Sequence, residues 1–234
     1  MDVTMRAPQP DPENKAAFVE AMFDRIAPRY DLLNRLLTLR LDQGWRKKAI
    51  ALVDVGPGDV VLDLGCGTGD LSELAARTGA RVIGIDPSAG MLAGMRSRAI
   101  DAAPLRADAS IIPLRDASAS VVVSGFALRN FVSIEAVFAD ITRVLRPAGR
   151  IALLEVDQPR FAPLRWLHGF HFNTIVPAVG RLLSDAEAYR YLPESTVYLP
   201  GETEMRDLMT SFGWSEITKK TLFGGVAQIL TAVR

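Results

Sequence analysis

Apolar residues recur at helical spacing in the first part of the chain. Phe18, Met22 and Ile26 follow one another at intervals of four residues, which is typical of a helix with one buried face. Pro28 interrupts the pattern, and a proline inside a helix removes a backbone hydrogen bond. We therefore predict that this helix ends near Pro28, that a second follows it, and that a third covers residues 42–55.

Strands and helices alternate from residue 60 onward. Short runs rich in Val, Ile and Leu predict strands at 60–64, 81–85, 105–107, around Val121, and at 151–156, 216–221 and 226–233. Helical patterns predict helices at 70–77, 88–99, 134–145 and 202–212, with Pro147-Ala148-Gly149 closing the third of these. Repeated β-α-β units with short links indicate an α/β fold, with a mostly parallel seven-stranded sheet and helices on both faces.

The domain organisation that we expect is a flexible tail at residues 1–13 and one domain over 14–234. Within the domain, residues 14–57 would form N-terminal helices, 58–160 the ligand-binding core, and 201–234 the last helix and strands. The stretch 161–200 is unusually apolar and predicts a helical insertion. It would form an apolar wall or lid over a ligand, or pack on the core as an ordinary buried helix.

Charge and cysteine content limit the classes of partner. The 27 basic and 27 acidic residues balance, so we expect no nucleic acid as a partner. The single cysteine, Cys66, forms no internal disulfide, and this fits the reducing cytosol. No apolar run is long enough to span a bilayer. We expect a cytoplasmic protein; peripheral contact with the inner membrane face, and the choice between monomer and homodimer, stay open.

Three glycines at alternate positions follow the first predicted strand, in the stretch DLGCGTGD at 63–70. Glycines at such a strand-to-helix turn let the backbone approach a ligand closely, although a tight turn without a ligand is the alternative. The third glycine comes one residue earlier than in the dinucleotide pattern, and Asp70 would repel a phosphate. Carboxylates instead suit a cationic ligand without phosphate, such as S-adenosylmethionine, which has an ammonium and a sulfonium.

Acidic residues close the first three predicted strands. Asp63 ends the first, Asp86 the second and Asp108 the third, so all three are expected at the carboxyl edge of the sheet. We expect Asp86 to accept hydrogen bonds from ribose hydroxyls and Asp108 from an adenine amine. Asp86 also stands just before a helix, so a capping role is the alternative for it. Ser88 is the predicted N-cap of that helix.

Four stretches resemble the ubiquinone/menaquinone biosynthesis C-methyltransferases, a branch of the class I S-adenosylmethionine-dependent methyltransferases. They are MFDRIAPRYDLLN at 22–34, DLGCGTGD at 63–70, FALRN at 126–130 and EAYRYLPES at 187–195. The first and last are far more specific than the glycine loop. The resemblance runs from about Phe18 to the last strands, and it implies the Rossmann-like fold of class I methyltransferases.

The resemblance also implies which residues bind the cofactor. In that family a serine contacts the cofactor at the position held here by Gly125, and Ser124 stands one residue earlier. The cofactor-binding residues that we expect are Tyr30, Asp63, Gly65, Gly67, Thr68, Asp86, Pro87, Met91, Asp108, Ala109, Ser124 and Gly125.

For the acceptor side, we expect Arg129, Asn130 and Tyr189 to act on the substrate. Arg129 would stabilise negative charge on a phenolic oxygen, and Asn130 would orient a hydroxyl. The alternative for Arg129 is an ion pair with Glu155 that only holds the loop. We expect no metal site, because the only two histidines have no Cys or Asp at ligand spacing.

The function implied by the resemblance is methyl transfer from S-adenosylmethionine to the ring of a demethylmenaquinol or a similar prenylated quinol. The C-terminal stretch departs from the family pattern, because Phe223 replaces a threonine and a histidine is missing. A methyltransferase for another small phenolic or secondary metabolite is therefore the first alternative. A non-catalytic S-adenosylmethionine-binding subunit is the second.

Overall fold

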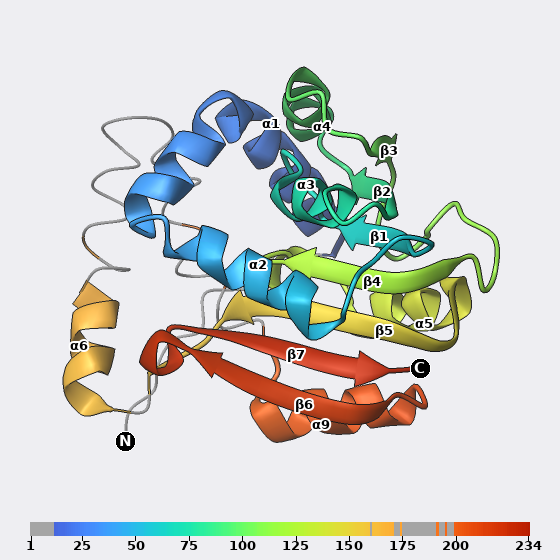
Figure 1. The fold of residues 1–234 in the computed structure, drawn as a ribbon. Coiled ribbons are helices and arrows are strands. Elements are labelled where there is room, and N and C mark those ends of the chain that lie inside the picture. Colours follow the sequence, from blue (N-terminus) through green and yellow to red (C-terminus); the bar gives the residue numbers. More distant parts are fainter. Residues whose placement is uncertain (1–11, 160, 171–173, 175–190, 192–194, 196–198) are drawn as a thin grey trace.

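The computed structural model describes residues 12–159, 161–170, 174, 191, 195 and 199–234 (Figure 1). Its centre is a seven-stranded sheet with the order β3-β2-β1-β4-β5-β7-β6. The strands are β1 Val60–Leu64, β2 Arg81–Asp86, β3 Ala103–Arg106, β4 Ala119–Gly125, β5 Leu145–Val156, β6 Ser215–Leu222 and β7 Ala227–Val233. Among these seven strands, β7 runs opposite to the other six. The predicted mostly parallel seven-stranded sheet is confirmed.

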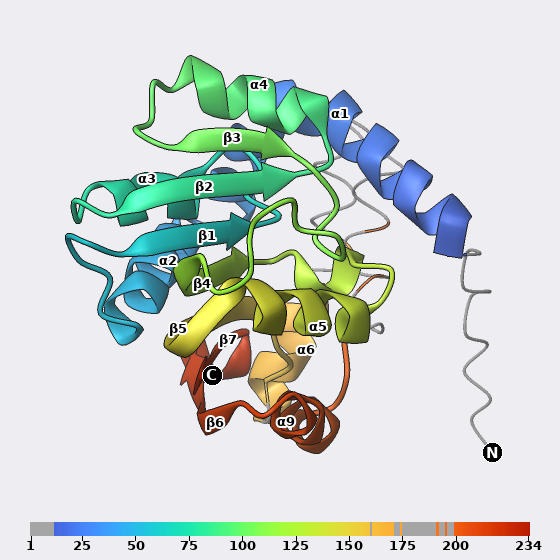
Figure 2. The same cartoon turned by 90° about the vertical axis from the view of Figure 1, so that its right-hand side faces the viewer.

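Helices cover both faces of the sheet, as Figures 1 and 2 show. They are α1 Pro12–Leu37, α2 Leu41–Leu52, α3 Asp70–Ala76, α4 Ala89–Ser97, α5 Ile134–Val144, α6 Ala162–Phe170 and α9 Glu202–Ser211. Two short 3-10 helices, η1 Leu128–Asn130 and η4 Phe223–Gly225, complete the described elements. The helices α5 and α9 pack on one face of the sheet, and α2 and α3 pack on the other.

The core forms because the central strands are apolar on both sides. In β4, Val122 belongs to the cluster with α5, while Val121 and Val123 belong to the cluster with α2 and α3. All three valines are fully buried. Successive side chains of a strand point to opposite faces, so a continuous apolar run is what a strand covered on both faces requires.

The N-terminal helices differ from the prediction. Pro28 lies inside one helix of 26 residues, so the expected break is wrong, and residues 12–59 form two helices where three were expected. Contacts on both sides of the proline hold the helix together. Asp24 accepts a hydrogen bond from the Gly90 N–H at 2.8 Å, and Asp31 accepts one from the Thr68 hydroxyl at 2.5 Å. These tertiary contacts outweigh the local cost of a proline.

The link between α5 and β5 also differs from the prediction. The sequence PAG at 147–149 was expected to close a helix, but β5 already begins at Leu145, next to the end of α5. Leu145 pairs with Ala119, whereas the next pair joins Arg150 to Val121. The register therefore shifts between these pairs, and Ala148, in the intervening stretch of β5, has a φ of 59°.

The parallel strands and β6 all end at the same edge of the sheet, which lies at the left in Figure 1 beside α1, α6 and η4. This arrangement gathers the loops after β1, β2, β3 and β4 at one place, where open α/β sheets bind ligands. Of the expected insertion at 161–200, α6 is described, and most of the remainder lies outside the described residues, as does most of the expected tail. None of the described helices combines the length and the apolar character needed to cross a membrane.

Candidate active site

A cavity of about 310 Å³ lies between α1 and the carboxyl edge of the sheet. Most of the residues predicted to bind the cofactor, and one predicted to act on the substrate, line it. These are Tyr30, Gly65, Gly67, Asp86, Pro87, Met91, Asp108, Ala109, Gly125 and Asn130. The loops that follow four successive strands of the sheet therefore meet at one cavity.

The glycine loop after β1 depends on a backbone conformation that favours glycine. Gly65, Gly67 and Gly69 have φ values of 64°, 55° and 89°. A Cβ at Gly65 would lie 2.5 Å from the Cβ of Ala127, so the loop packs tightly against the start of η1. At Gly67 the nearest atom to such a Cβ is the Met91 sulfur at 3.9 Å, so this side of the loop remains open to the cavity.

Asp86 connects two of the loops that line the cavity. Its carboxylate accepts from the Gly67 N–H and from the Ser88 N–H, both at 2.9 Å. Burial raises the pKa of Asp86 to about 6, against the opposing effect of these two hydrogen bonds. Ser88 is the N-cap of α4, as predicted, and its hydroxyl accepts from the Met91 N–H at 3.1 Å. Asp86 therefore presents a carboxylate to the cavity and also holds the amino end of α4.

Asp108 is the second carboxylate of the cavity. It follows β3 and accepts hydrogen bonds from both the N–H and the hydroxyl of Ser110, at 2.7 and 2.6 Å. Ala109, Ile85 and Met91 supply apolar lining nearby. Two separated carboxylates with apolar groups between them suit a ligand that has hydroxyls or amines at its ends and a flat apolar middle.

Two of the predicted cofactor residues lie beneath the glycine loop and are not among the residues that line the cavity. Asp63 is buried in β1 and accepts from the Ser72 hydroxyl at 2.7 Å, and its other carboxylate oxygen has no hydrogen-bond partner in the described part of the chain. Burial raises the pKa of Asp63 to about 6. Ser124 donates its hydroxyl to the Leu64 carbonyl at 2.8 Å. Both residues brace the strands that carry the loop.

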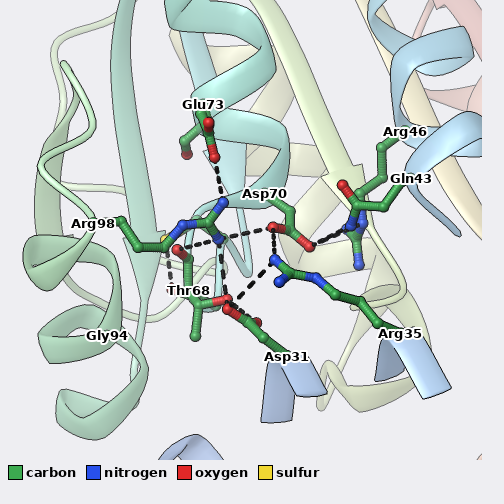
Figure 3. Close-up of polar contacts among 12 residues, drawn as sticks. Asp31, Arg35, Gln43, Arg46, Thr68, Asp70, Glu73, Gly94 and Arg98 are labelled. Atoms are coloured by element: carbon green, nitrogen blue, oxygen red, sulfur yellow. Dashed lines mark hydrogen bonds and ion pairs between the residues drawn. The ribbon is translucent and has the colours of Figure 1, made fainter. Parts of the chain in front are cut away.

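Thr68 and Asp70 face away from the cavity, toward the charged cluster that Figure 3 shows. Thr68 donates to Asp31 of α1, and Asp70 accepts from Arg98 at 2.7 Å. Arg46 of α2 lies 3.5 Å from the same carboxylate. Burial alone would raise the pKa of Asp70, but Arg46 and Arg98 outweigh burial and lower it. The expectation that Asp70 presents its charge to a ligand is therefore wrong. Asp70 instead ties the glycine loop to the N-terminal helices.

Packing, as well as close approach of a ligand, requires a glycine at position 125. A Cβ there would lie 2.8 Å from Leu71 Cδ1 and 3.0 Å from a guanidinium nitrogen of Arg46. The residue is small because these two side chains pack behind it. Phe126 follows with a φ of 62°, and the Arg46 guanidinium lies 5.2 Å from the centre of its ring.

The expected acceptor residues occupy two different positions. Arg129 is buried and forms an ion pair with the carboxylate of Glu155, which is the pairing that the sequence analysis held as its alternative. Asn130 lines the cavity, and its buried side-chain oxygen has no hydrogen-bond partner among the described residues. Glu155 lines a second cavity of about 300 Å³ at the ends of β5 and β7. Tyr189 lies outside the described residues.

The sequence analysis missed the part that α1 plays in the cavity wall. Beside Tyr30, whose pKa is raised by burial, this helix contributes Ala16, Val19, Glu20 and Phe23. Their spacing of three and four residues is that of one helical face, so the signal was present in the sequence. Only the docking of α1 across the sheet edge, however, shows that this face covers a ligand site.

The residues present fit the cofactor expected from the sequence. The glycine loop leaves open space at Gly67, while Asp86 and Asp108 offer acceptors for hydroxyls and for an amine. No cationic side chain is found in the lining of this cavity, as far as the described residues go, so a phosphate would lack a partner there.

Comparison with known proteins agrees with this site. The sequence matches the ubiE/COQ5 methyltransferase family over residues 11–234. A demethylmenaquinone methyltransferase from Roseiflexus sp. (strain RS-1) is 40% identical over 230 residues, which cover 96% of this chain and 97% of the relative. A ubiquinone/menaquinone biosynthesis C-methyltransferase UbiE from Geotalea daltonii is 34% identical, covering 93% of this chain and 96% of the relative.

A solved structure of a SAM-dependent methyltransferase from Thermotoga maritima has the same fold, with a TM-score of 0.65 and 19% identity. The similarity covers 92% of this chain and 99% of that one. The chain thus belongs to the ubiE/COQ5 methyltransferase family, has the class I methyltransferase fold and is an S-adenosylmethionine-dependent methyltransferase, as predicted.

The pKa of Asp63 gives a stability prediction. Because the folded pKa, about 6, lies above the ordinary aspartate pKa of 3.8, the folded state holds this proton more tightly, and its contribution to stability is lost as pH rises through about 6. Asp63→Asn removes this dependence. We expect the free energy of unfolding of the variant, relative to the natural protein, to increase by about 2–3 kcal/mol between about pH 4 and about pH 7. Urea denaturation across this range measures it.

The matched control for this measurement is Asp207→Asn, an exposed carboxylate on α9. Its difference from the natural protein should stay constant with pH. A constant difference for Asp63→Asn as well would show that the Asp63 carboxyl titrates normally, and would contradict the assigned burial effect.

Proposed function

Because the chain belongs to the ubiE/COQ5 methyltransferase family, we propose that it methylates a ring carbon of a demethylmenaquinol or a similar prenylated quinol. One observation carries the proposal: a single cavity is lined by Gly67, Asp86 and Asp108 and also by the apolar Phe131 and Val132. The first three suit a nucleoside, and the two apolar residues suit an apolar ring. The names of the relatives at 34–40% identity support a quinone ring in particular.

We propose the following roles on the cofactor side. Asp86 accepts from the ribose hydroxyls, and Asp108 accepts from the adenine amine. The glycine loop lets its backbone lie against the cofactor. Thr68, Asp63 and Ser124 support the loop from behind. When bound, the cofactor supplies an electrophilic methyl group.

On the acceptor side, a ring carbon becomes nucleophilic when a neighbouring hydroxyl loses its proton. We propose that Asn130 orients that hydroxyl, since Asn130 lines the cavity and its buried side-chain oxygen has no partner among the described residues. Arg129 stabilises the oxyanion, and the Glu155 carboxylate holds the guanidinium in place from behind. Tyr189 stays a proposed substrate contact. The ring carbon would take the methyl group as its bond to the cofactor sulfur breaks, S-adenosylhomocysteine would leave, and the ring carbon would then release its hydrogen as a proton to water.

A second candidate is a methyltransferase for another small phenolic compound. Phe223, which stands where the family has threonine, is 60% exposed on η4. The element η4 follows the carboxyl end of β6, at the sheet edge where the parallel strands also end, and a changed residue at this edge supports a different acceptor.

We also propose peripheral contact with the cytoplasmic face of an anionic membrane, from which a prenylated substrate would come. Phe161, Trp166 and Phe170 are exposed on and before α6, and Phe223 is exposed on η4. The two elements touch, since a Cβ at Gly224 would lie 2.5 Å from Leu164 Cδ2. We call Phe161, Trp166, Phe170 and Phe223 the aromatic patch. Aromatic side chains favour the membrane interface.

The charges around the aromatic patch fit such a surface. Arg165 in α6 and Lys220 near the end of β6 are exposed, and neither has a carboxylate partner among the described residues. Both would attract anionic lipid headgroups. A homodimer contact through the same patch is the alternative occupant.

The substrate prediction is tested with labelled S-adenosylmethionine and a panel of quinols and phenols. We expect ring methylation of prenylated demethylmenaquinols, with a kcat/KM at least about tenfold above that for the same ring without its prenyl tail, because each buried methylene adds binding energy. Methylation of simple phenols alone would contradict the quinol proposal and favour the second candidate.

For the acceptor residues, the variant Arg129→Lys keeps the charge beside Glu155 but loses the guanidinium fork. We expect kcat to fall about 100-fold, while the Kd for S-adenosylmethionine changes less than about twofold. The matched control is Arg143→Lys, whose arginine pairs with Asp140 away from the cavity. A variant that folds and keeps full kcat would show that Arg129 only holds the loop.

For the membrane proposal, the double variant Trp166→Ser, Phe223→Ser should bind vesicles containing phosphatidylglycerol about tenfold more weakly than the natural protein. Leu52→Ser, at the end of α2, is the matched control for an exposed apolar residue elsewhere. Equal vesicle binding by the double variant would contradict the proposal. A dimer that the double variant disrupts in sedimentation, with vesicle binding unchanged, would assign the aromatic patch to a dimer contact.

A further inference from the structure

Asp24, in α1, holds the amino end of α4 from outside the cavity. Its Oδ1 accepts from the Ser88 hydroxyl at 2.6 Å and from the Gly90 N–H at 2.8 Å. Asp24 is not among the residues that line the cavity. Its two contacts join α1 to Ser88, which follows β2, and to the first turn of α4, close to Asp86 at the end of β2.

Ser88 passes this contact on to the cavity. The Ser88 N–H donates to Asp86 Oδ1, and the Gly67 N–H donates to Asp86 Oδ2. Ser88 is completely buried and Asp86 is 8% exposed, so water has little access to compete for these bonds. A continuous series of hydrogen bonds thus runs from Asp24 through Ser88 and Asp86 to the glycine loop.

Gly90 shows that the close approach of α1 is built into the chain. A Cβ at Gly90 would lie 3.2 Å from both the Cα and the carbonyl oxygen of Asp24. Contacts this short with backbone atoms are tighter than ordinary side-chain packing allows. A glycine is therefore what lets the Asp24 carboxylate reach the N–H groups at the start of α4.

Charge adds a second connection between α1 and Asp86. After burial, which is the largest cause, the negative charges of Asp24 and Glu20 raise the pKa of Asp86. The groups that face Asp86 are Glu20 and Asp24 from α1, Asp63 from β1, Cys66 from the glycine loop, and Arg106 from β3. Arg106 pairs with Glu20 at 2.6 Å, whereas Asp24 forms no ion pair with any of the described residues.

We propose that Asp24 is a positioning residue for the cofactor, acting through Ser88 to orient the Asp86 carboxylate and to set the pH range over which it binds ribose. This inference rests on the proposed role of Asp86 in cofactor binding. Asp24 itself touches neither cofactor nor substrate.

The test compares two substitutions at Asp24 by calorimetric titration with S-adenosylmethionine at about pH 8. Asp24→Ala removes both hydrogen bonds, and we expect the Kd to rise about tenfold. Asp24→Asn keeps an acceptor oxygen for Ser88 and Gly90, so the Kd should stay within about twofold. Ser88→Ala, which removes the same link from the α4 side, should resemble Asp24→Ala. Asp207→Asn is the control for a remote carboxylate.

The pH dependence separates positioning from a merely structural role. Cofactor binding by the natural protein should weaken as pH falls through about 6, because Asp86 becomes protonated. Asp24→Asn removes a negative charge, which lowers the pKa of Asp86, so its binding should persist to lower pH. A substitution that only loosened the fold would leave this midpoint unchanged.

Two outcomes overturn the inference, and a third identifies a different failure. A Kd for both Asp24→Ala and Ser88→Ala equal to that of the natural protein, or an unshifted pH midpoint for Asp24→Asn, would contradict the role of Asp24. If Asp86→Ala also leaves the Kd unchanged, the cofactor site itself has been assigned wrongly. Loss of binding in Asp86→Ala alone would support the proposed site while rejecting Asp24 as a positioning residue.

Discussion

Asp24 and Asp31 lie two turns apart on α1, and the shape of the cofactor cavity depends on the contacts of these two carboxylates. Asp24 binds the start of α4, and Asp31 binds Thr68 on the glycine loop. The loops after β1 and β2 are thus fastened to the helix that covers them. The spacing of seven residues places both carboxylates on one face, while Val19 and Phe23 face the cavity. Without these contacts, nothing would offset the cost of Pro28 inside α1.

Most of the buried charges around the cavity have a partner of opposite charge. Asp70 lies against Arg46 and Arg98, and Glu155 pairs with Arg129, so these ions are compensated behind the loops. Within the described part of the chain, Asp86 is compensated only by N–H groups, and burial raises its pKa to about 6. It is therefore a carboxylate for which additional hydrogen-bond donors would be favourable. A ligand that brings hydroxyl donors to this position relieves a cost that the folded protein otherwise carries.

Much of the fold was readable from the sequence, because buried strands require unbroken apolar runs such as Val121–Val123 and glycines mark the turn after β1. Local rules failed where tertiary contacts decide: Pro28 argued for a helix break, and the stretch at 147–149 for a helix end. Some of the residues predicted for the candidate site line the cavity, and others face away from it. Asp86 and Asp108 line the cavity, but Thr68 points to α1. Side-chain direction in a loop depends on partners distant in sequence, and pattern alone does not show them.

The central claim is that S-adenosylmethionine lies in the cavity under α1, with its ribose on Asp86. A crystal structure of the full chain with S-adenosylhomocysteine tests this most directly. The account predicts both ribose hydroxyls within about 2.5–3.2 Å of the Asp86 carboxylate oxygens and the adenine amine beside Asp108, with the Asp24–Ser88 contact intact. A ligand bound in the second cavity beside Glu155, or a ribose held by other groups while Asp86 keeps only its backbone partners, would contradict it.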